Sequence, residues 1–357
     1  MQYLKLGPVK LPYKITTESD KKVFRICGMR IPFSTLEKNG NKYYRFFGLT
    51  FRLPFLDKYF ITQSKSNYLM RDQLTDEKIR QICTAIFQEK VGYTPDLEHP
   101  RSMNEKIFWM KLNYHDPLIT KCCDKFAVKD YVTEKLGPGY VVPTIASWEN
   151  PEDIQWDSLP QQFALKVNWS SGYNIIVKDK SQLNREEATA KIRHWMQPQQ
   201  NSYYQTFNWG YKNMKPVVYA ENYIEQTDGQ LYDYKFYCCN GKVQFLFIAT
   251  DRYKSGKLTY NFYDTDFNPL PFTYGGRGHA ENLEKPHFYD EMIRCAERLA
   301  QPFPFVRVDF YEAEGTLRVG EMTFYSGGGI LPFDPPEWDY KLGKLIPLPE
   351  RETHKGD

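Results

Sequence analysis

Residues 304–329 read PFVRVDFYEAEGTLRVGEMTFYSGGG, and the pattern indicates two short strands joined by a turn. Charged side chains stand among apolar ones in both strands. Arg307 and Asp309 share one face of the first strand, because side chains two residues apart point the same way. Charges inside a sheet are costly unless something pairs with them. The hairpin therefore predicts partners that must come from elsewhere in the chain.

The second strand of this hairpin carries Glu321 and Thr323 on one face. Either register that keeps the faces aligned places Asp309 opposite or diagonal to Glu321, and such neighbours lie about 5–8 Å apart. One or two Mg²⁺ ions can bridge this span, since paired carboxylates suit a hard cation that is shared with phosphates. A structural Arg–Glu pair would explain the same residues. The other face is expected to pack in a core, and it holds Val306, Val308, Phe310, Gly320, Met322 and Phe324.

Length and composition predict a globular protein of two or three subdomains, because 357 residues exceed what one core usually holds. No run of about 18 apolar residues occurs, which argues against a helix that spans a membrane. The first residues, MQYLKLGPVKLPY, lack an apolar core followed by a small-residue cleavage site. Four of the seven cysteines form two adjacent pairs, Cys122–Cys123 and Cys238–Cys239, which lack zinc-ligand spacing and favour free thiols. We therefore expect a cytoplasmic protein.

The first 70 residues form a basic segment. They hold 13 Lys/Arg against 4 Asp/Glu, a charge of +9, so the other 287 residues must sum to −6 to give the net +3. A weak repeat places an aromatic residue four positions before a glycine, at Tyr3, Phe24 and Tyr44. We expect short strands or hairpins, with EKNGNK as one turn. One interpretation is that the segment binds anionic lipid or an acidic glycan. The other is that it is only a β-rich extension of the main domain, with basic residues that protect the edges of its strands.

The remaining chain alternates between helical and strand patterns. Helical spacing of apolar residues predicts helices in five stretches: residues 75–93, 102–114, 118–137, 184–197 and 285–303. Alternation and turn residues predict strands at 163–167 and 174–178, a strand with a connector at 216–225, and a hairpin at 231–251 turned by Asn240 and Gly241. This order is α+β with antiparallel hairpins, and it is not a regular βαβ alternation.

Three further positions suggest a nucleotide. Lys166 ends the strand FALK and leads into the loop NWSSGYN, and a lysine with a small-residue loop can hold a phosphate. In AENYIE, Glu221 begins a connector whose backbone can meet an adenine edge. Lys235 stands in a strand among aromatic residues, where it needs an anion or is a satisfied edge residue.

These pieces, in this order, resemble the ATP-grasp superfamily, and more closely the TupA-like ATP-grasp family of surface-polysaccharide gene clusters. The resemblance covers roughly residues 75–345 and rests on these motifs: SMNEKIFWMKL, DPLITKCCDKFAVKDYV, FALKVNWSSGYNIIVKDK, AENYIEQTDG, YDYKFYCCNGK, DRY, NFYDTDFNPL and VRVDF…VGEMTFYSGGG. It implies an ATP-grasp fold, in which two α+β lobes clasp the nucleotide, with a β-rich basic N-terminal extension. The expected segments are 1–70, the extension; 71–145, a helical part; 146–220, the small lobe with a phosphate-loop lid; 221–347, the large lobe with the metal site; and 348–357, a flexible tail.

The resemblance also implies ATP and Mg²⁺ as cofactors. The implied nucleotide-binding residues are Lys125, Lys166, Ser170, Ser171, Gly172, Glu221, Tyr223, Glu225, Asp228 and Lys235. Among these, Glu221 matches the hinge glutamate that faces the adenine amino group, and either Glu225 or Asp228 would hold the ribose.

Metal-binding and catalytic positions follow from the same resemblance. The implied metal ligands are Asp309, Glu321 and Thr323, the last standing where relatives often carry Asn. Arg307 matches the arginine that stabilises an oxyanion, and Lys235 the lysine that reaches the outer phosphates. The loop at 168–173, NWSSGY, departs from the glycine-richer HGSGG-like loop of the family. The large side chains of Trp169 and Tyr173 are expected to change the shape of the lid over the phosphates.

The implied activity is that of an ADP-forming carboxylate–amine ligase that works through an acyl phosphate in capsule or lipopolysaccharide assembly. Its partners would be a carboxylate such as a uronic acid or an amino acid, an amine, and an anionic membrane through residues 1–70, but no nucleic acid. Three alternatives stay open. DTD at residues 264–266 fits a metal-dependent glycosyltransferase, although it also reads as a turn. The other two are a phosphotransferase and a nucleotide-binding protein without turnover.

Overall fold

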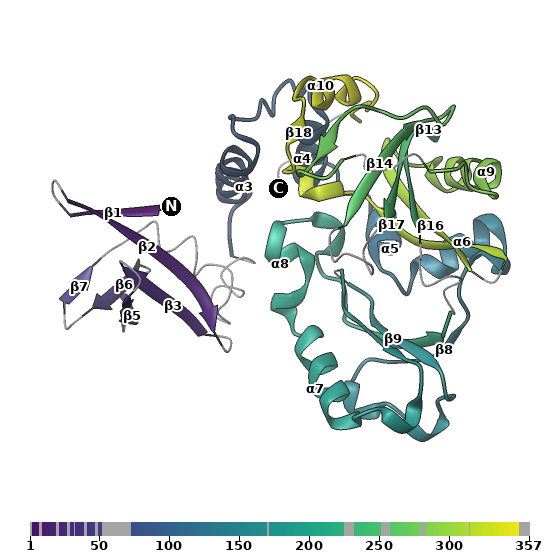
Figure 1. Ribbon diagram of the computed structural model, residues 1–357, viewed down its shortest axis with the longest axis horizontal. Helices are drawn as coiled ribbons and strands as arrows, with labels where there is room; N and C mark the ends of the chain where they lie inside the picture. Colours follow the sequence, from purple (N-terminus) through teal and green to yellow (C-terminus); the bar gives the residue numbers. More distant parts are fainter. Residues whose placement is uncertain are drawn as a thin grey trace, which may run out of the picture. The chain divides into compact units, whose positions relative to one another are not determined.

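The computed structural model describes residues 73–169, 171–224, 232–250, 258–278, 283–313 and 315–349, together with the backbone of seven strands within residues 2–51. The chain divides into two compact units, Met1–Met70 and Arg71–Asp357. Figure 1 shows the first unit in purple and the second in blue to yellow.

The first unit consists of antiparallel hairpins. One sheet has the order β1-β2-β3-β4, with strands Gln2–Leu6, Val9–Glu18, Lys21–Ile26 and Met29–Ile31. The other has the order β5-β6-β7, with strands Phe33–Lys38, Asn41–Phe46 and Leu49–Phe51. Each copy of the sequence repeat spans one hairpin, with the closing pairs Leu6–Val9, Ile26–Met29 and Phe46–Leu49. The predicted hairpins are confirmed, including the one at EKNGNK, where Lys38 pairs with Asn41.

The second unit contains two larger antiparallel sheets. The smaller has the order β10-β9-β11-β8, formed by Asn174–Val177, Phe163–Val167, Val218–Asn222 and Thr144–Trp148. The larger has the order β14-β13-β12-β16-β17, formed by Thr259–Asp264, Lys242–Thr250, Asp233–Cys239, Phe305–Ala313 and Thr316–Thr323. A short pair joins β15 (Thr273–Tyr274) to β18 (Phe333–Asp334).

Helices cover these sheets. The α-helices are α3 (Asp76–Val91), α4 (Met103–Asn113), α5 (Pro117–Cys123), α6 (Val128–Leu136), α7 (Arg185–Trp195), α8 (Ser202–Thr206), α9 (Tyr289–Ala300) and α10 (Glu337–Gly343). The 3₁₀ turns are Pro138–Tyr140, Pro151–Asp153, Trp156–Ser158, Lys180–Gln182, Pro198–Gln200, Trp209–Tyr211 and Ser326–Gly329. Helix α9 packs against β12, β13 and β16, whereas α5 and α6 pack against β17 (Figure 1).

One predicted helix is wrong. The stretch at 118–137 forms two helices, because the Asp124 carboxylate accepts hydrogen bonds from the backbone N–H groups of Phe126 (2.8 Å) and Ala127 (3.0 Å). Such an Asx-type turn competes with helix continuation and starts a new helix. The break places Lys125 at the junction of α5 and α6, where its backbone N–H donates to Asn168 O (2.9 Å) beside the smaller sheet.

The final hairpin has the predicted apolar face with one exception. Val306, Val308, Phe310, Met322 and Phe324 are all buried in the main core. Gly320 was expected there too, but it is exposed at a bulge between the pairs Asp309–Glu321 and Phe310–Val319. An extra residue in one strand of an antiparallel pair stays unpaired and leaves the alternation of faces.

Two composition-based expectations can be compared with the described residues. Six cysteines there are free and buried: Cys83, Cys122, Cys123, Cys238, Cys239 and Cys295. Within that same part of the chain, none of the helices combines the length and apolar character that crossing a membrane requires.

Candidate active site

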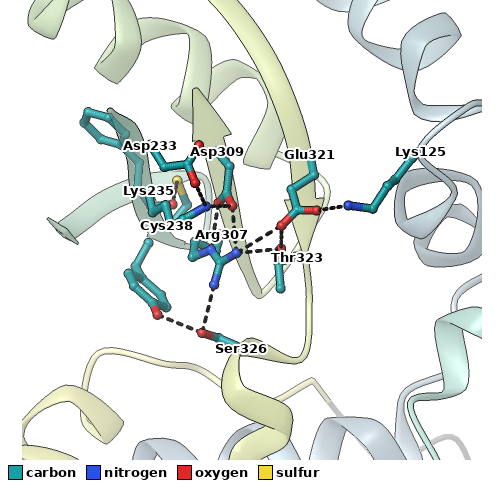
Figure 2. A network of polar contacts seen from close by, with 11 residues as sticks. Lys125, Asp233, Lys235, Cys238, Arg307, Asp309, Glu321, Thr323 and Ser326 are labelled. Atoms are coloured by element: carbon teal, nitrogen blue, oxygen red, sulfur yellow. Dashed lines mark hydrogen bonds and ion pairs between the residues drawn. The ribbon is translucent and has the colours of Figure 1, made fainter. Parts of the chain in front are cut away.

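The charged residues of the final hairpin form two rows across the larger sheet. In the first row, Asp309 lies directly opposite Glu321 of β17 and directly opposite Lys235 of β12. In the second row, Arg307 lies directly opposite Thr323. Residues paired across strands share a face. The sheet register therefore brings these five side chains together on one face (Figure 2).

Arg307 is the centre of the cluster. Its Nε and Nη2 donate to the two carboxylate oxygens of Asp309 at 2.6 and 2.7 Å. Nη2 also reaches Thr323 Oγ1 (3.0 Å) and Glu321 Oε1 (3.3 Å), and Nη1 donates to Ser326 Oγ (3.3 Å). Figure 2 shows the guanidinium between both acids and the start of the SGGG turn. One cation thus orients both carboxylates and joins them to the turn that follows.

Two lysines complete the charge balance. Lys235 Nζ lies 2.5 Å from Asp309 Oδ2 and 3.6 Å from Asp233 Oδ2, and Lys125 Nζ lies 2.5 Å from Glu321 Oε2. Three cations therefore face three carboxylates. This is how the hairpin holds charge at low cost, since buried charges need partners.

The environment separates the pKa values of the two facing carboxyl groups. The ammonium of Lys125 holds the pKa of Glu321 well below its ordinary value. Burial raises the pKa of Asp309, and Arg307 and Lys235 oppose this rise. Glu321 is therefore ionised over the whole physiological range, as a cation ligand must be.

A cleft that is partly open to solvent adjoins the cluster. It lies between the two large sheets and the α5–α6 segment, and its lining residues are Lys125, Val128, Lys129, Val132, Val141, Val142, Lys166, Tyr219, Glu221, Tyr311, Val319 and Gly320. Apolar walls with a few polar groups are typical of small-molecule sites. Lys125 links cleft and cluster, because it lines the first and binds Glu321 of the second.

Glu221 is the buried acid of this cleft, and a lysine holds each of its oxygens. Lys166 pairs with Oε1, and Lys129 Nζ lies 2.8 Å from Oε2. Lys129 also donates to Val142 O and Thr144 Oγ1, both at 2.9 Å. Sequence reasoning missed Lys129. Its contact with Glu221 spans 92 residues, so no local spacing in the sequence points to it.

Comparison with protein families matches residues 105–347, more than half of the chain, to the family described as TupA-like ATPgrasp. The chain belongs to the TupA-like ATP-grasp family. This membership, with the antiparallel sheets, confirms the predicted fold class and the resemblance. A search of curated proteins gives no match.

Solved structures also align with this TupA-like ATP-grasp chain, at low similarity. D-alanine–D-alanine ligase from Bacillus anthracis, complexed with ATP, has 15% identity and a TM-score of 0.33, with 62% of this chain and 55% of that chain covered. The Helicobacter pylori D-alanine–D-alanine ligase has 14% identity and a TM-score of 0.36, with 63% of this chain and 61% of that chain covered. An L-amino acid ligase from Bacillus licheniformis has 14% identity and a TM-score of 0.39, with 71% of this chain and 54% of that chain covered. The chain thus spans little more than half the length of these proteins.

The loop that departs from the family pattern is packed away from the cleft. Trp169 is buried, and its Nε1 donates to Trp195 O of α7 (2.9 Å). The ring of Tyr173 stacks on Trp195 at 5.4 Å, and its hydroxyl donates to Gln200 Oε1 (2.7 Å). Neither bulky ring lines the cleft. The bulk anchors the loop to its own lobe and leaves Ser171 and Gly172 exposed.

Of the other predicted site residues, those that the structure describes do not join the cluster. Ser170, Glu225 and Asp228 lie outside the described residues. Tyr223 is half-buried and is not among the residues that line the cleft. The DTD stretch forms a turn: Asp264 accepts the backbone N–H groups of Asp266 (3.0 Å) and Asn268 (2.8 Å). The acid proposed for a glycosyltransferase metal is therefore engaged in local structure.

The fit of Mg²⁺ to the cluster depends on other ligands. In the part of the chain that the structure describes, no three His, Cys, Asp or Glu residues are grouped to hold a metal ion. Asp309 and Glu321 supply the hard oxygen donors that Mg²⁺ prefers, but only from two residues. Mg²⁺ is commonly bound by one or two carboxylates together with substrate phosphates. The cluster fits a magnesium ion that arrives with a nucleotide.

Proposed function

We propose that this protein is an ATP-dependent carboxylate–amine ligase that forms an amide through an acyl phosphate. The observation that carries the proposal is the pair of facing acids, Asp309 and Glu321, held by Arg307 and Lys235 beside the cleft. Membership of an ATP-grasp family supports ATP as the bound nucleotide, and the apolar walls and lysines of the cleft suit a base and its phosphates.

The charge balance supports a requirement for magnesium. The three acids and three cations of the cluster already neutralise one another. Polyphosphate brings several negative charges, so added positive charge is needed for it to bind there. Bound Mg²⁺ would supply this charge and neutralise the charge that develops on the transferred phosphoryl group.

Within the cleft, the proposed roles follow from side-chain chemistry. The valines with Tyr219 and Tyr311 would cover the base, and the Glu221 carboxylate would accept from the adenine amino group. Lys166 and Lys125 of the cleft, with Lys235 of the adjoining cluster, would bind phosphates by exchanging their present carboxylate partners for phosphate oxygens. Ser171 and Gly172, with Ser170, Glu225 and Asp228, stay proposed contacts to phosphate and ribose, as does Tyr223 to the base.

The proposed reaction has two balanced steps. A substrate carboxylate oxygen bonds to the γ-phosphorus, the bond to the β-phosphate oxygen breaks, and ADP leaves. An amine nitrogen then bonds to the carbonyl carbon of the acyl phosphate, loses a proton, and phosphate departs. Arg307 would stabilise the oxyanion of this second step, because donors aimed at developing charge lower the barrier most.

The biological setting is proposed from the family resemblance alone. The carboxylate would be a uronic acid or an amino acid, and the product an amide in capsule or lipopolysaccharide assembly. We place the enzyme in the cytoplasm, with residues 1–70 in contact with the inner membrane face and no nucleic-acid partner.

The test is incubation with ATP, Mg²⁺ and panels of amino acids and nucleotide-linked uronic acids, with ADP release and product mass as readouts. ADP release that needs both a carboxylate and an amine, and stops with Glu321→Gln, is the expected result. Release without an amine would mean a phosphotransferase. ATP binding without any turnover would mean a binding protein, and sugar-nucleotide binding without ATP binding would mean a glycosyltransferase.

A further inference from the structure

The strand pairing of the first unit sorts its residues onto two unlike faces. Side chains alternate between faces along a strand, and paired residues share a face. Applied to the pairing of β1 to β4, this alternation puts Leu, Ile, Val, Met or Phe at nine of thirteen positions on one face. The other face has eleven positions, with one acid, Glu18, and the six cations Lys5, Lys10, Lys14, Lys21, Arg25 and Arg30.

On the basic face, the backbone register places cationic residues directly opposite one another. Lys5 pairs with Lys10, Lys14 pairs with Arg25, and Arg25 pairs with Arg30. Like charges opposite one another destabilise a sheet. Three such pairs in one small sheet are an energetic cost that an anionic partner would remove.

We propose that this face of β1 to β4 is a docking surface for an anionic lipid bilayer. The cations spread over all four strands, which lie about 4.8 Å apart, so they form a two-dimensional patch. A bilayer offers negative charge in two dimensions, whereas a single polyanionic chain offers it along one line. Tyr3 shares the basic face, and tyrosine is enriched where proteins meet the lipid headgroups.

The inference is independent of the ligase proposal, because binding is measured without ATP. The full-length chain is sedimented with vesicles of equal parts phosphatidylglycerol and phosphatidylcholine, and with phosphatidylcholine alone. Binding is expected only with phosphatidylglycerol, and is expected to disappear in 1 M salt, where the Debye screening length falls to about 3 Å. Arg25→Gln with Arg30→Gln is expected to weaken it about 30-fold, since each basic residue near the surface contributes about fivefold.

A matched pair of single variants tests the face itself. Lys14→Gln and Lys22→Gln remove the same charge from opposite faces of the sheet. A fivefold loss is expected for the first and less than twofold for the second. Equal losses, or no preference for phosphatidylglycerol, would overturn the proposal. So would binding to polygalacturonate or an oligonucleotide without binding to vesicles. If circular dichroism shows that the double variant misfolds, Lys5→Gln with Lys10→Gln takes its place.

Discussion

Lys125 Nζ lies 2.5 Å from Glu321 Oε2, although 196 residues separate the two in sequence. The backbone N–H of Lys125 donates to Asn168 O beside the smaller sheet, while its side chain reaches the larger one. This residue thus contacts both lobes and lines the cleft. A phosphate that draws Lys125 away from Glu321 would free a carboxylate oxygen for a metal, so we predict that this ion pair couples nucleotide binding to metal binding.

Glu321→Gln is expected to reduce ATP turnover at least 100-fold with little loss of stability. The Glu321 side chain is 30% exposed, so its ion pair with Lys125 contributes about 1 kcal/mol or less to folding. Steady-state ADP release and thermal unfolding measure the two effects. Asp309→Asn is the contrasting variant, because Asp309 is 5% exposed and its carboxylate is the closest charged partner of both Arg307 and Lys235. That change is expected to cost about 3–5 kcal/mol. Full turnover in Glu321→Gln would rule out the metal role.

Lys129→Met is expected to raise the KM for ATP about tenfold and to weaken the preference for ATP over GTP. Without Lys129, Glu221 keeps only Lys166, which phosphates would draw away, so its carboxylate loses its fixed position. Steady-state kinetics with both nucleotides measure the change, and kcat should stay within about threefold. Lys129→Arg should recover most of the preference.

Lys135→Met is the matched control for this prediction. Lys135 lies on the same helix, α6, but pairs with the exposed Glu134 at the surface. It should leave both KM values unchanged. A parallel loss of ATP and GTP use in Lys129→Met, with reduced stability, would instead indicate a purely structural role.

Tyr173→Phe is expected to lower stability by about 1 kcal/mol, the usual value of one hydrogen bond, through loss of the contact to Gln200. The KM for ATP should stay within about twofold, because the ring stacks on Trp195 and does not line the cleft. Chemical denaturation and nucleotide kinetics check both parts. A fivefold rise in KM at unchanged stability would place Tyr173 over the phosphates after all.

Lys111→Met is expected to stabilise the fold while impairing use of the amine or carboxylate substrate. Lys111 is buried, and burial lowers its pKa to about 8. The ammonium donates to Gly328 O (2.8 Å) in the SGGG turn, where Gly327, Gly328 and Gly329 all have positive φ. A buried charge kept at such a turn suggests that the turn's shape matters for function.

The stabilisation from Lys111→Met should depend on pH. Below pH 8 the folded state carries the charged form at a cost of about 3 kcal/mol, and this cost fades as pH rises from 8 toward 10.5. Unfolding curves at pH 7 and 10 measure the difference. Lys106→Met is the control, since Lys106 on the same helix donates to Ile346 O instead. Substrate KM values equal to the native ones would contradict a role for the turn.

Local patterns in the sequence were enough to predict most helices and strands, and to predict the part of the site that lies on the final hairpin. Alternation in residues 304–329 predicts that Arg307, Asp309 and Glu321 share a face, and the register confirms that Asp309 is opposite Glu321. These relations depend on neighbours within one hairpin, so the chain encodes them at short range. The bulge at Gly320 and the helix break at Asp124 are also local, but turn chemistry there overrides the hydrophobic period that predicted otherwise.

Contacts between distant segments could be found only in the packed molecule. Lys129 meets Glu221 across 92 residues, and Lys125 meets Glu321 across 196. No periodicity relates such pairs, because their distance depends on how α5 and α6 pack between two sheets. The orientation of Trp169 and Tyr173 also depends on distant contacts. The sequence shows that both side chains are large, but only the packed structure shows that both contact Trp195 and do not line the cleft. Steric interactions between neighbouring residues determine which helices and strands form. Burial of the apolar surfaces between those helices and strands then determines which charged side chains come into contact.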